Sequence, residues 1–301
     1  MPSAERPTVI ALLLGLRGLS ILLIVASELA AVGVLPTEFG AGLGEIGLMI
    51  FVVISGFVLA LRHIHDRCDG HALLDFAKSR ARGLLPAYAV AVVASLVIEG
   101  WWDEWPYRFH SVGAVVRAVF LLDAPGALWI VPVLAQCYLL FVIAWWLWSR
   151  GWSIWTLVAM ALAVPIPAVL GWYPHGGHGL AVVVPYFVAG MALGTAWPAT
   201  IEPFMVRHLG PVSVVGGVAF VLACINVPAV RISHGWTLGH SILAATWFDP
   251  LNALVVIALV VAAATRPIAL AVLGTAPLLL LGQYWLALYL VAPVLAAALP
   301  D

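Results

Sequence analysis

Runs of about 20 consecutive apolar residues recur along the whole chain, and they constrain its fold more than any other feature. Lipid cannot hydrogen-bond an open backbone, so each run must be helical or lie within protein. The composition agrees, because 64% of the 301 residues are hydrophobic and only 9% are charged, too few for the surface of a water-soluble domain. The sequence therefore predicts an all-α, polytopic transmembrane helix bundle.

The apolar runs divide into about nine to ten spans. We place them at 8–33, 43–62, 85–101, 128–149, 152–170, 180–199, 211–229, 243–264 and 268–299, and the last can also be two short helices broken near Gly282-Gln283. The stretch 112–122 is apolar but short, and Arg117 interrupts it, so an interfacial or re-entrant helix is expected there. We expect residues 1–301 to form a single integral membrane domain.

The basic residues predict the orientation, because cytoplasmic loops carry an excess of Lys and Arg. With the N-terminus inside, the inner set is Arg6, Arg62, Arg67, Lys78, Arg80, Arg82, Arg150, Arg207 and Arg266, and the outer set is Arg108, Arg117 and Arg231. We therefore expect a bacterial inner-membrane protein with its N-terminus and the loop from Arg62 to Arg82 in the cytoplasm. The net charge of −1 offers no basic surface, so no nucleic-acid partner is expected.

Two ionisable residues, Arg17 and Glu28, lie within the first span. At about 100° and 1.5 Å per residue they share one helix face and lie about 16 Å apart, too far for a direct pair. A charge at this depth is costly unless it faces protein or water, so such residues are candidates for function. Two interpretations stay open: a polar pathway through the bundle, or a structural network in which carbonyl groups hold Arg17.

The remaining titratable residues predict neither a metal site nor a permanently bound cofactor. Cys68, Cys137 and Cys224 are scattered, with neither disulfide nor zinc spacing. The loop after the second span is rich in such residues: His63, His65, Asp66, Cys68 and His71. A zinc site there is the weaker alternative to an ordinary solvated loop.

Six short sequence motifs occur along the chain, and their order indicates a family although each motif alone is weak. They are Arg17; Gly47, Phe51, Val53, Ser55, Gly56 and Phe57; Arg80, Pro86 and Tyr88; Trp129, Gln136, Tyr138 and Leu139; Pro185-Tyr186-Phe187 with Gly190-Met191; and Leu281-Gly282 with Leu288-Tyr289-Leu290. In this order they resemble the acyltransferase-3 family of integral membrane acyltransferases. The resemblance implies that family's fold from Arg17 to Ala292.

Four positions depart from the family pattern. Glu28 stands where the family has a His, Gly83 where it has a second Arg, Leu134 where it has a Glu and Ala292 where it has a late His. The resemblance implies that the first-span His is the catalytic base and that the Arg residues bind acyl-CoA. A Glu can take over only if its surroundings let it exchange a proton near neutral pH, as an imidazole does.

Two functional hypotheses follow from this pattern of matches and losses. The first is a pseudoenzyme that acts as a scaffold or accessory subunit, with membrane lipids and other membrane protein subunits or pigments as partners. The second is an active O-acyltransferase that moves an acyl group from acyl-CoA, its co-substrate, to a carbohydrate or lipid hydroxyl. Its candidate catalytic residues are Glu28 and Arg17, and its candidate substrate-binding residues are Arg80, Arg82, Trp129, Gln136 and Tyr138. The losses favour the first hypothesis.

Overall fold

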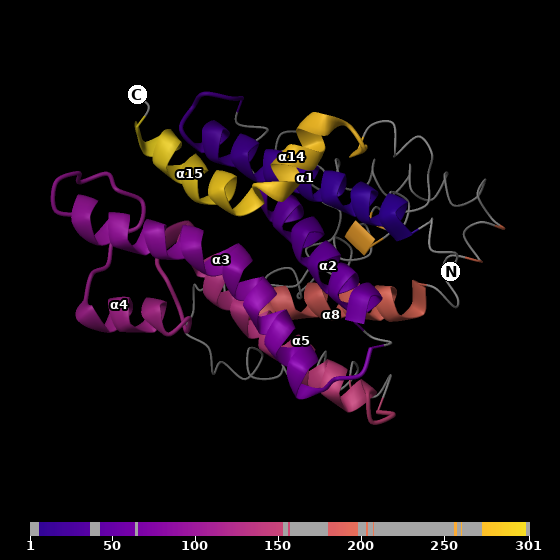
Figure 1. Cartoon of the computed structure of the whole chain (residues 1–301). Helices are drawn as coiled ribbons and strands as arrows, with labels where there is room; N and C mark the ends of the chain where they lie inside the picture. Colours follow the sequence, from indigo (N-terminus) through magenta and orange to yellow (C-terminus); the bar gives the residue numbers. More distant parts are fainter. Residues whose placement is uncertain are drawn as a thin grey trace, which may run out of the picture. The chain divides into compact units, whose positions relative to one another are not determined.

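The computed structural model describes residues 6–36, 43–63, 66–152, 180–197 and 273–298, together with Thr156, Pro203, Arg207, Val256, Ile257 and Val260. Every regular element in these residues is a helix (Figure 1). The elements are α1 (Arg6–Ala31), α2 (Leu43–His63), α3 (Gly70–Ile98), α4 (Val112–Val119), the 3-10 helix η2 (Gly126–Trp129), α5 (Ile130–Trp148), α8 (Leu180–Ala196), α14 (Ala276–Gln283) and α15 (Trp285–Ala298).

Among the described residues, four helical segments are long and apolar enough to cross a membrane: Ala11–Ala31, Leu43–His63, Gly70–Ile98 and Gly126–Trp148. This confirms the all-α transmembrane class. The shorter apolar helix Val183–Ala196 falls on the expected span 180–199. The expected spans 152–170, 211–229 and 243–264 lie almost entirely outside the described residues. The total of about nine to ten spans therefore stays a prediction.

The last expected span is broken as the sequence suggested. Helices α14 and α15 meet at an angle of 83°, and together they have the length and composition of one more span. Tyr284 separates them, and its N–H donates to the carbonyl of Leu280. The break adjoins Gly282-Gln283, where it was expected.

The third helix begins earlier than expected, at Gly70 rather than at residue 85. The carboxylate of Asp69 accepts a hydrogen bond of 2.8 Å from the N–H of Ala72, which caps the first turn. Lys78, Arg80 and Arg82 therefore lie on a helix and not in a loop. Hydropathy registers only the apolar second half of such a helix, whereas the cap fixes its true start.

The chain divides into two compact units, Met1–Leu61 with Pro185–Trp285 and Arg62–Val184 with Leu286–Asp301. In the first unit, helices pack so closely that only glycine fits at the contact. A methyl group on Gly190 of α8 would overlap the carbonyl oxygen of Val53, and one on Gly56 of α2 would overlap that of Phe187. Small residues allow this approach between membrane helices.

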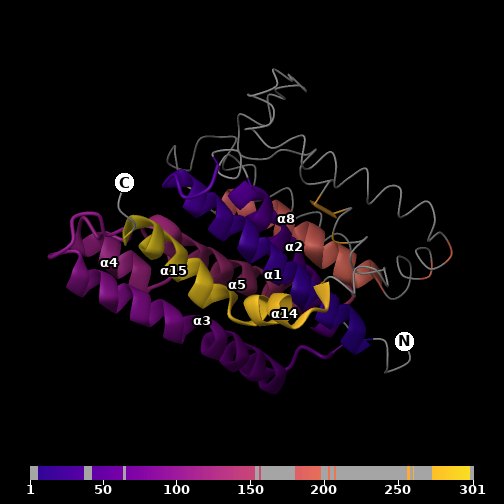
Figure 2. The same cartoon turned by 90° about the horizontal axis from the view of Figure 1, so that it is seen from above.

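Glycines also join α1 to α14 within the first unit. A side chain on Gly18 would overlap the carbonyl oxygen of Leu278, and one on Gly282 would overlap that of Leu14. Figure 2 shows α14 lying beside α1. This contact packs α14 closely against α1.

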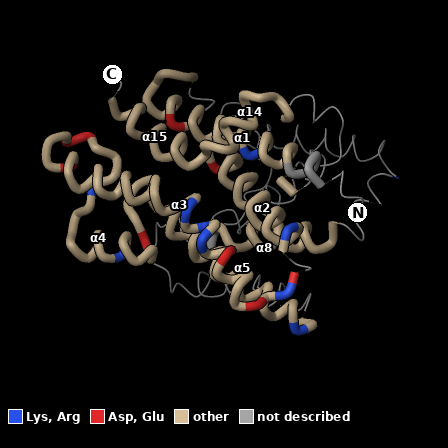
Figure 3. Tube along the Cα trace, viewed as in Figure 1, with Lys and Arg blue, Asp and Glu red and all other residues tan. Residues whose placement is uncertain are grey.

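The second unit contains α3, α4, α5 and most of α15. Its core is aromatic and comes largely from α3 and α5, where Phe76, Tyr138, Phe141 and Trp145 are all buried. The hydroxyl of Tyr107 donates a hydrogen bond of 2.6 Å to the carbonyl of Leu290 in α15. Figure 3 shows basic and acidic residues along the first half of α3, while most of the other described helices are uncharged along their length.

Candidate functional site

Arg17 lies against two aromatic rings of the first unit. Its guanidinium carbon is 4.5 Å from the ring centroid of Phe51 and 4.9 Å from that of Trp285. The two rings are themselves 4.3 Å apart. A cation held over ring faces is stabilised by their electron density. Arg17 therefore faces protein side chains, as expected from the high free energy of a charged side chain exposed to lipid.

Glu28 lies further along the same helix and is half-buried. Helix α1 is continuous between the two residues, so their expected separation of about 16 Å along the axis holds. The structure thus places both candidates on one continuous helix face but does not bring them into contact. Their catalytic role stays a prediction.

Arg80 and Tyr138, two candidate substrate-binding residues, do meet in the second unit. The guanidinium carbon of Arg80 is 5.5 Å from the ring centroid of Phe76 and 5.6 Å from that of Tyr138. The Nε of Arg80 is buried and has no hydrogen-bond partner among the described residues. Arg82, two residues further along α3, is exposed and turns to another face of the helix.

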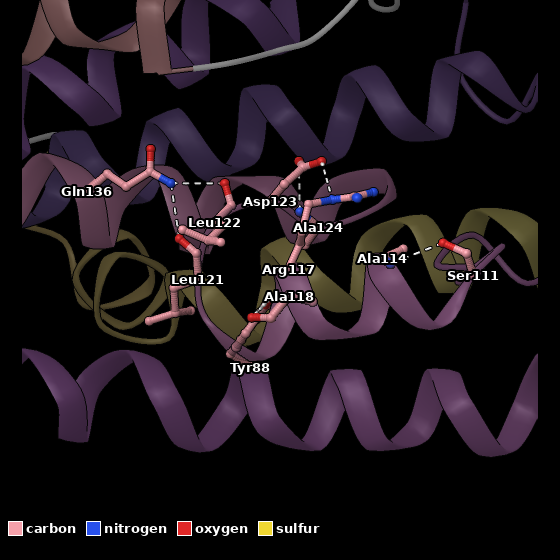
Figure 4. A network of polar contacts seen from close by, with 10 residues as sticks. All are labelled: Tyr88, Ser111, Ala114, Arg117, Ala118, Leu121, Leu122, Asp123, Ala124 and Gln136. Atoms are coloured by element: carbon pink, nitrogen blue, oxygen red, sulfur yellow. Dashed lines mark hydrogen bonds and ion pairs between the residues drawn. The ribbon is translucent and has the colours of Figure 1, made fainter.

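Gln136 and Tyr88 are engaged with backbone carbonyl groups (Figure 4). The Nε2 of Gln136 in α5 donates to the carbonyls of Leu121 and Leu122, at 3.0 Å each. The hydroxyl of Tyr88 in α3 donates to the carbonyl of Ala118 at 3.0 Å. Tyr88 therefore holds the last turn of α4, and Gln136 holds the segment that follows it.

Trp129 and the three substituted positions Gly83, Leu134 and Ala292 differ in how far they are buried. Trp129 ends η2 and is half-buried at the start of α5. Leu134 is 0% exposed, and Ala292 is also buried. Gly83 is exposed on α3, with open space where a side chain would be. None of these three substituted positions offers a side chain that exchanges a proton or donates a hydrogen bond.

An aromatic cluster around His63 was not anticipated. The imidazole ring lies 5.2 Å from Trp145 and 5.6 Å from Phe76, between ring centroids. The Nε1 of Trp145 donates to the carbonyl of Asp66 at 3.0 Å. The spacing of Tyr138, Phe141 and Trp145 along one face of α5 was the available signal.

The described residues contain no group of three or more His, Cys, Asp or Glu side chains placed to hold a metal ion. His63 and Asp66 lie 3.9 Å apart, and His71 and Asp75 lie 3.1 Å apart as an i, i+4 pair on α3. His65 lies outside the described residues.

The apolar helices, with arginines held over aromatic rings inside them, define an α-helical integral membrane protein. Its sequence matches the family model of the acyltransferase domain, acyltransferase-3, over residues 12–299. Because the match covers nearly the whole chain, the protein belongs to the acyltransferase-3 family. No curated protein and no solved structure shows a significant match to the chain.

Proposed function

We propose that this protein is a non-catalytic member of the acyltransferase-3 family that serves as a scaffold or accessory subunit of a larger assembly in a bacterial inner membrane. One observation carries the proposal. Where the resemblance implies polar catalytic groups, Leu134 and Ala292 are buried apolar residues. The retained Gln136 and Tyr88 bind backbone carbonyls instead of facing a free site.

The chemistry of acyl transfer explains why these substitutions matter. A base must remove the proton of the acceptor hydroxyl as its oxygen attacks the thioester carbonyl, and donors must stabilise the oxyanion that forms. Of the four substituted positions, only Glu28 can exchange a proton. Loss of a single oxyanion donor typically lowers the rate by about 10²–10³. Several such losses leave little beyond binding.

A second function is supported by Arg80, one of the candidate substrate-binding residues. Its guanidinium lies half-buried against the rings of Phe76 and Tyr138, and its buried Nε has no hydrogen-bond partner among the described residues, a setting in which a guanidinium can bind an anion. In this alternative, acyl-CoA is the co-substrate, and Arg80 and Arg82 bind its phosphates. Glu28 takes the proton of a carbohydrate or lipid hydroxyl, the ester bond forms as the thioester bond breaks, and free CoA leaves.

Turnover of acetyl-CoA by the pure protein separates the two functions. Release of the CoA thiol is measured for the unchanged chain and for Glu28→Ala, with Glu45→Ala as the matched control because Glu45 is an exposed carboxylate in the first turn of α2. We expect all three to stay at the background rate. Robust turnover that Glu28→Ala abolishes and Glu45→Ala retains would exclude the scaffold function. A stoichiometric membrane protein that copurifies in mild detergent is the corresponding positive result.

A further inference from the structure

The segment after Ser111 descends alongside α3 instead of leaving it. The Ser111 hydroxyl accepts a hydrogen bond from the N–H of Ala114 and caps α4, which runs beside α3 in both views (Figures 1 and 2). At the far end of α4, the carbonyl of Ala118 meets the hydroxyl of Tyr88. Tyr88 lies ten residues before Ile98, the end of α3, which is about 15 Å at 1.5 Å per residue.

That distance is about half of the hydrocarbon thickness of roughly 30 Å. Helix α3 has the composition of a membrane span, and its second half, which contains Tyr88, is the apolar half. The eight residues of α4 cover about 12 Å, which matches the descent from the end of α3 to the depth of Tyr88. The tip that follows α4 therefore lies at the depth of the acyl chains.

Each N–H group from Phe120 to Ala124 in this tip donates a hydrogen bond, as hydrocarbon requires of a buried donor. The N–H groups of Phe120, Leu121, Leu122 and Asp123 donate to carbonyls within α4, and that of Ala124 donates to the Asp123 carboxylate. The carbonyls of Leu121 and Leu122 accept from Gln136 (Figure 4). Leu121 has a φ of 56°, a left-handed conformation that is uncommon outside glycine, and it makes the reversal at the tip.

The outer face of α4 is apolar. Ala118 is buried against the protein, whereas four large apolar side chains point away from it: Val112 (81% exposed), Val116, Val119 and Phe120 (70% exposed). Leu122 is exposed beyond them. Arg117 lies at the edge of this face, and its Nε is 3.9 Å from the Asp123 carboxylate, so the two charges are paired with each other. Such pairing is what ionisable groups at membrane depth require.

We propose that residues 112–124 form a re-entrant element whose face of Val112, Val116, Val119, Phe120 and Leu122 is covered by lipid acyl chains, and that Tyr88 and Gln136 hold its tip at depth. The depth of the tip, its bonded N–H groups and the bonded carbonyls of Leu121 and Leu122 identify lipid as the occupant. A loop in water would not need these internal hydrogen bonds, because water itself bonds free backbone groups. This assignment decides between the interfacial and re-entrant alternatives for the segment, and it is independent of whether the protein transfers acyl groups.

Site-directed spin labelling of the full chain in phosphatidylcholine–phosphatidylglycerol vesicles tests the proposal. Cys68 and Cys224 are replaced by serine, and Cys137 is left because it is fully buried. Labels at Val116→Cys and Phe120→Cys are compared with Val93→Cys, an exposed apolar position on α3, and with Ser111→Cys at the cap. Collisions with oxygen, which enters acyl chains, and with a water-soluble nickel chelate are measured for each label.

We expect positions 116 and 120 to match position 93, with frequent oxygen collisions and few nickel collisions, and position 111 to show the reverse. Nickel access at position 120 equal to that at position 111 would overturn the proposal. Protection of position 120 from both probes would also overturn it, because protein and not lipid would then cover the face.

The holding role is tested with the same labels. Gln136→Leu removes the donor to the tip carbonyls, Tyr88→Phe removes the donor to the Ala118 carbonyl in the last turn of α4, and each keeps the size of the side chain similar. Each should raise nickel access at position 120 and leave position 93 unchanged. Unchanged access at position 120 in both variants would show that these residues do not hold the tip. The position 93 label also reports whether α3 has kept its place in lipid.

Discussion

At the scale of single residues, three arginines in the described part of the chain hold their guanidinium groups over aromatic rings. Arg17 and Arg80 each face two rings, and Arg150 lies 3.7 Å above the ring of Trp146. A desolvated cation–π contact contributes about 2 kcal/mol. The planar guanidinium can stack on a ring face and still direct its N–H donors outward at the edge of the ring. A lysine would lose the planar stacking that the rings provide.

Cys68 gives a residue-scale prediction that depends on pH. Burial, and after it the carboxylate of Asp69, raise the pKa of the Cys68 thiol. Less thiolate is therefore present at a given pH than in an ordinary cysteine. Asp69→Asn removes the charge and keeps a side chain that caps α3. The pKa should fall, and the curve of alkylation rate against pH should move to lower pH.

The measurement uses iodoacetamide on a Cys224→Ser background, since Cys137 is fully buried. Asp75→Asn is the matched control, because Asp75 is an exposed carboxylate of α3 that pairs with His71. A curve that moves to higher pH in Asp69→Asn, or equally in both variants, would contradict the electrostatic part of the argument.

At the scale of elements, α3 is a single helix with a charged first half and an apolar second half. Its first half carries Asp75, Lys78, Arg80 and Arg82, and its second half is apolar apart from Tyr88 and Ser95. The hydroxyl of Ser95 donates to the carbonyl of Ala91 in the same helix, so it needs no outside partner. At 29 residues α3 is about 43 Å long, longer than the hydrocarbon core. Its charged half therefore extends beyond the lipid.

The glycines of α2 and α8 lead to an element-scale prediction. Gly190→Ala forces a methyl group onto the carbonyl of Val53, so it should destabilise the protein by about 1–3 kcal/mol or more. Gly83→Ala in α3 is the matched control, because nothing lies within reach of its new methyl group. It should stabilise by roughly 0.5–1 kcal/mol, since alanine favours a helix.

Thermal unfolding in mild detergent, followed by near-ultraviolet circular dichroism, compares the two variants. The buried thiol of Cys137 provides a second readout, because a thiol-reactive dye reaches it only after unfolding. Equal midpoints for Gly190→Ala and the unchanged protein would show that the two helices can separate at this contact without loss.

At the scale of the whole molecule, the chain passes between its two units at three points, and each of these points lies within a helix or at its start. One falls at Pro185 inside α8, another at the break between α14 and α15, and the third follows Leu61 near the end of α2. Each unit has a ring-bound arginine: Arg17 lies in the first unit, and Arg80 and Arg150 lie in the second.

Orientation in the membrane gives the whole-molecule prediction. The distribution of basic residues predicts that Lys78 lies in the cytoplasm and that His110, beside the cap of α4, lies on the outer side. In intact cells, a membrane-impermeant maleimide should label His110→Cys and leave Lys78→Cys unlabelled until the cells are lysed. Both positions are exposed, so access to the reagent is not limited by burial. The opposite pattern would reverse the orientation.

The features of the fold and site that the sequence predicts are those that depend on residues close together in the chain. The helical class, the break near Gly282 and the short helix at 112–122 follow from local composition and spacing. The early start of α3 was missed because a single capping carboxylate, Asp69, does not alter a hydropathy average. The contacts of Gln136 and Tyr88 join residues 14 to 30 positions apart, which only tertiary structure can reveal.

The close contact between α2 and α8 has a consequence for the temperature dependence of stability. Helices that part inside a bilayer exchange protein contacts for acyl chains that are equally apolar, so no water is released or ordered. The heat-capacity change that curves the stability of water-soluble proteins is therefore nearly absent from this step. The backbones that meet at Gly56 and Gly190 are held by dispersion contacts between closely fitting surfaces. These contacts do not depend on the hydration of apolar groups, so they do not weaken on cooling. This part of the protein should have no cold-denaturation limit.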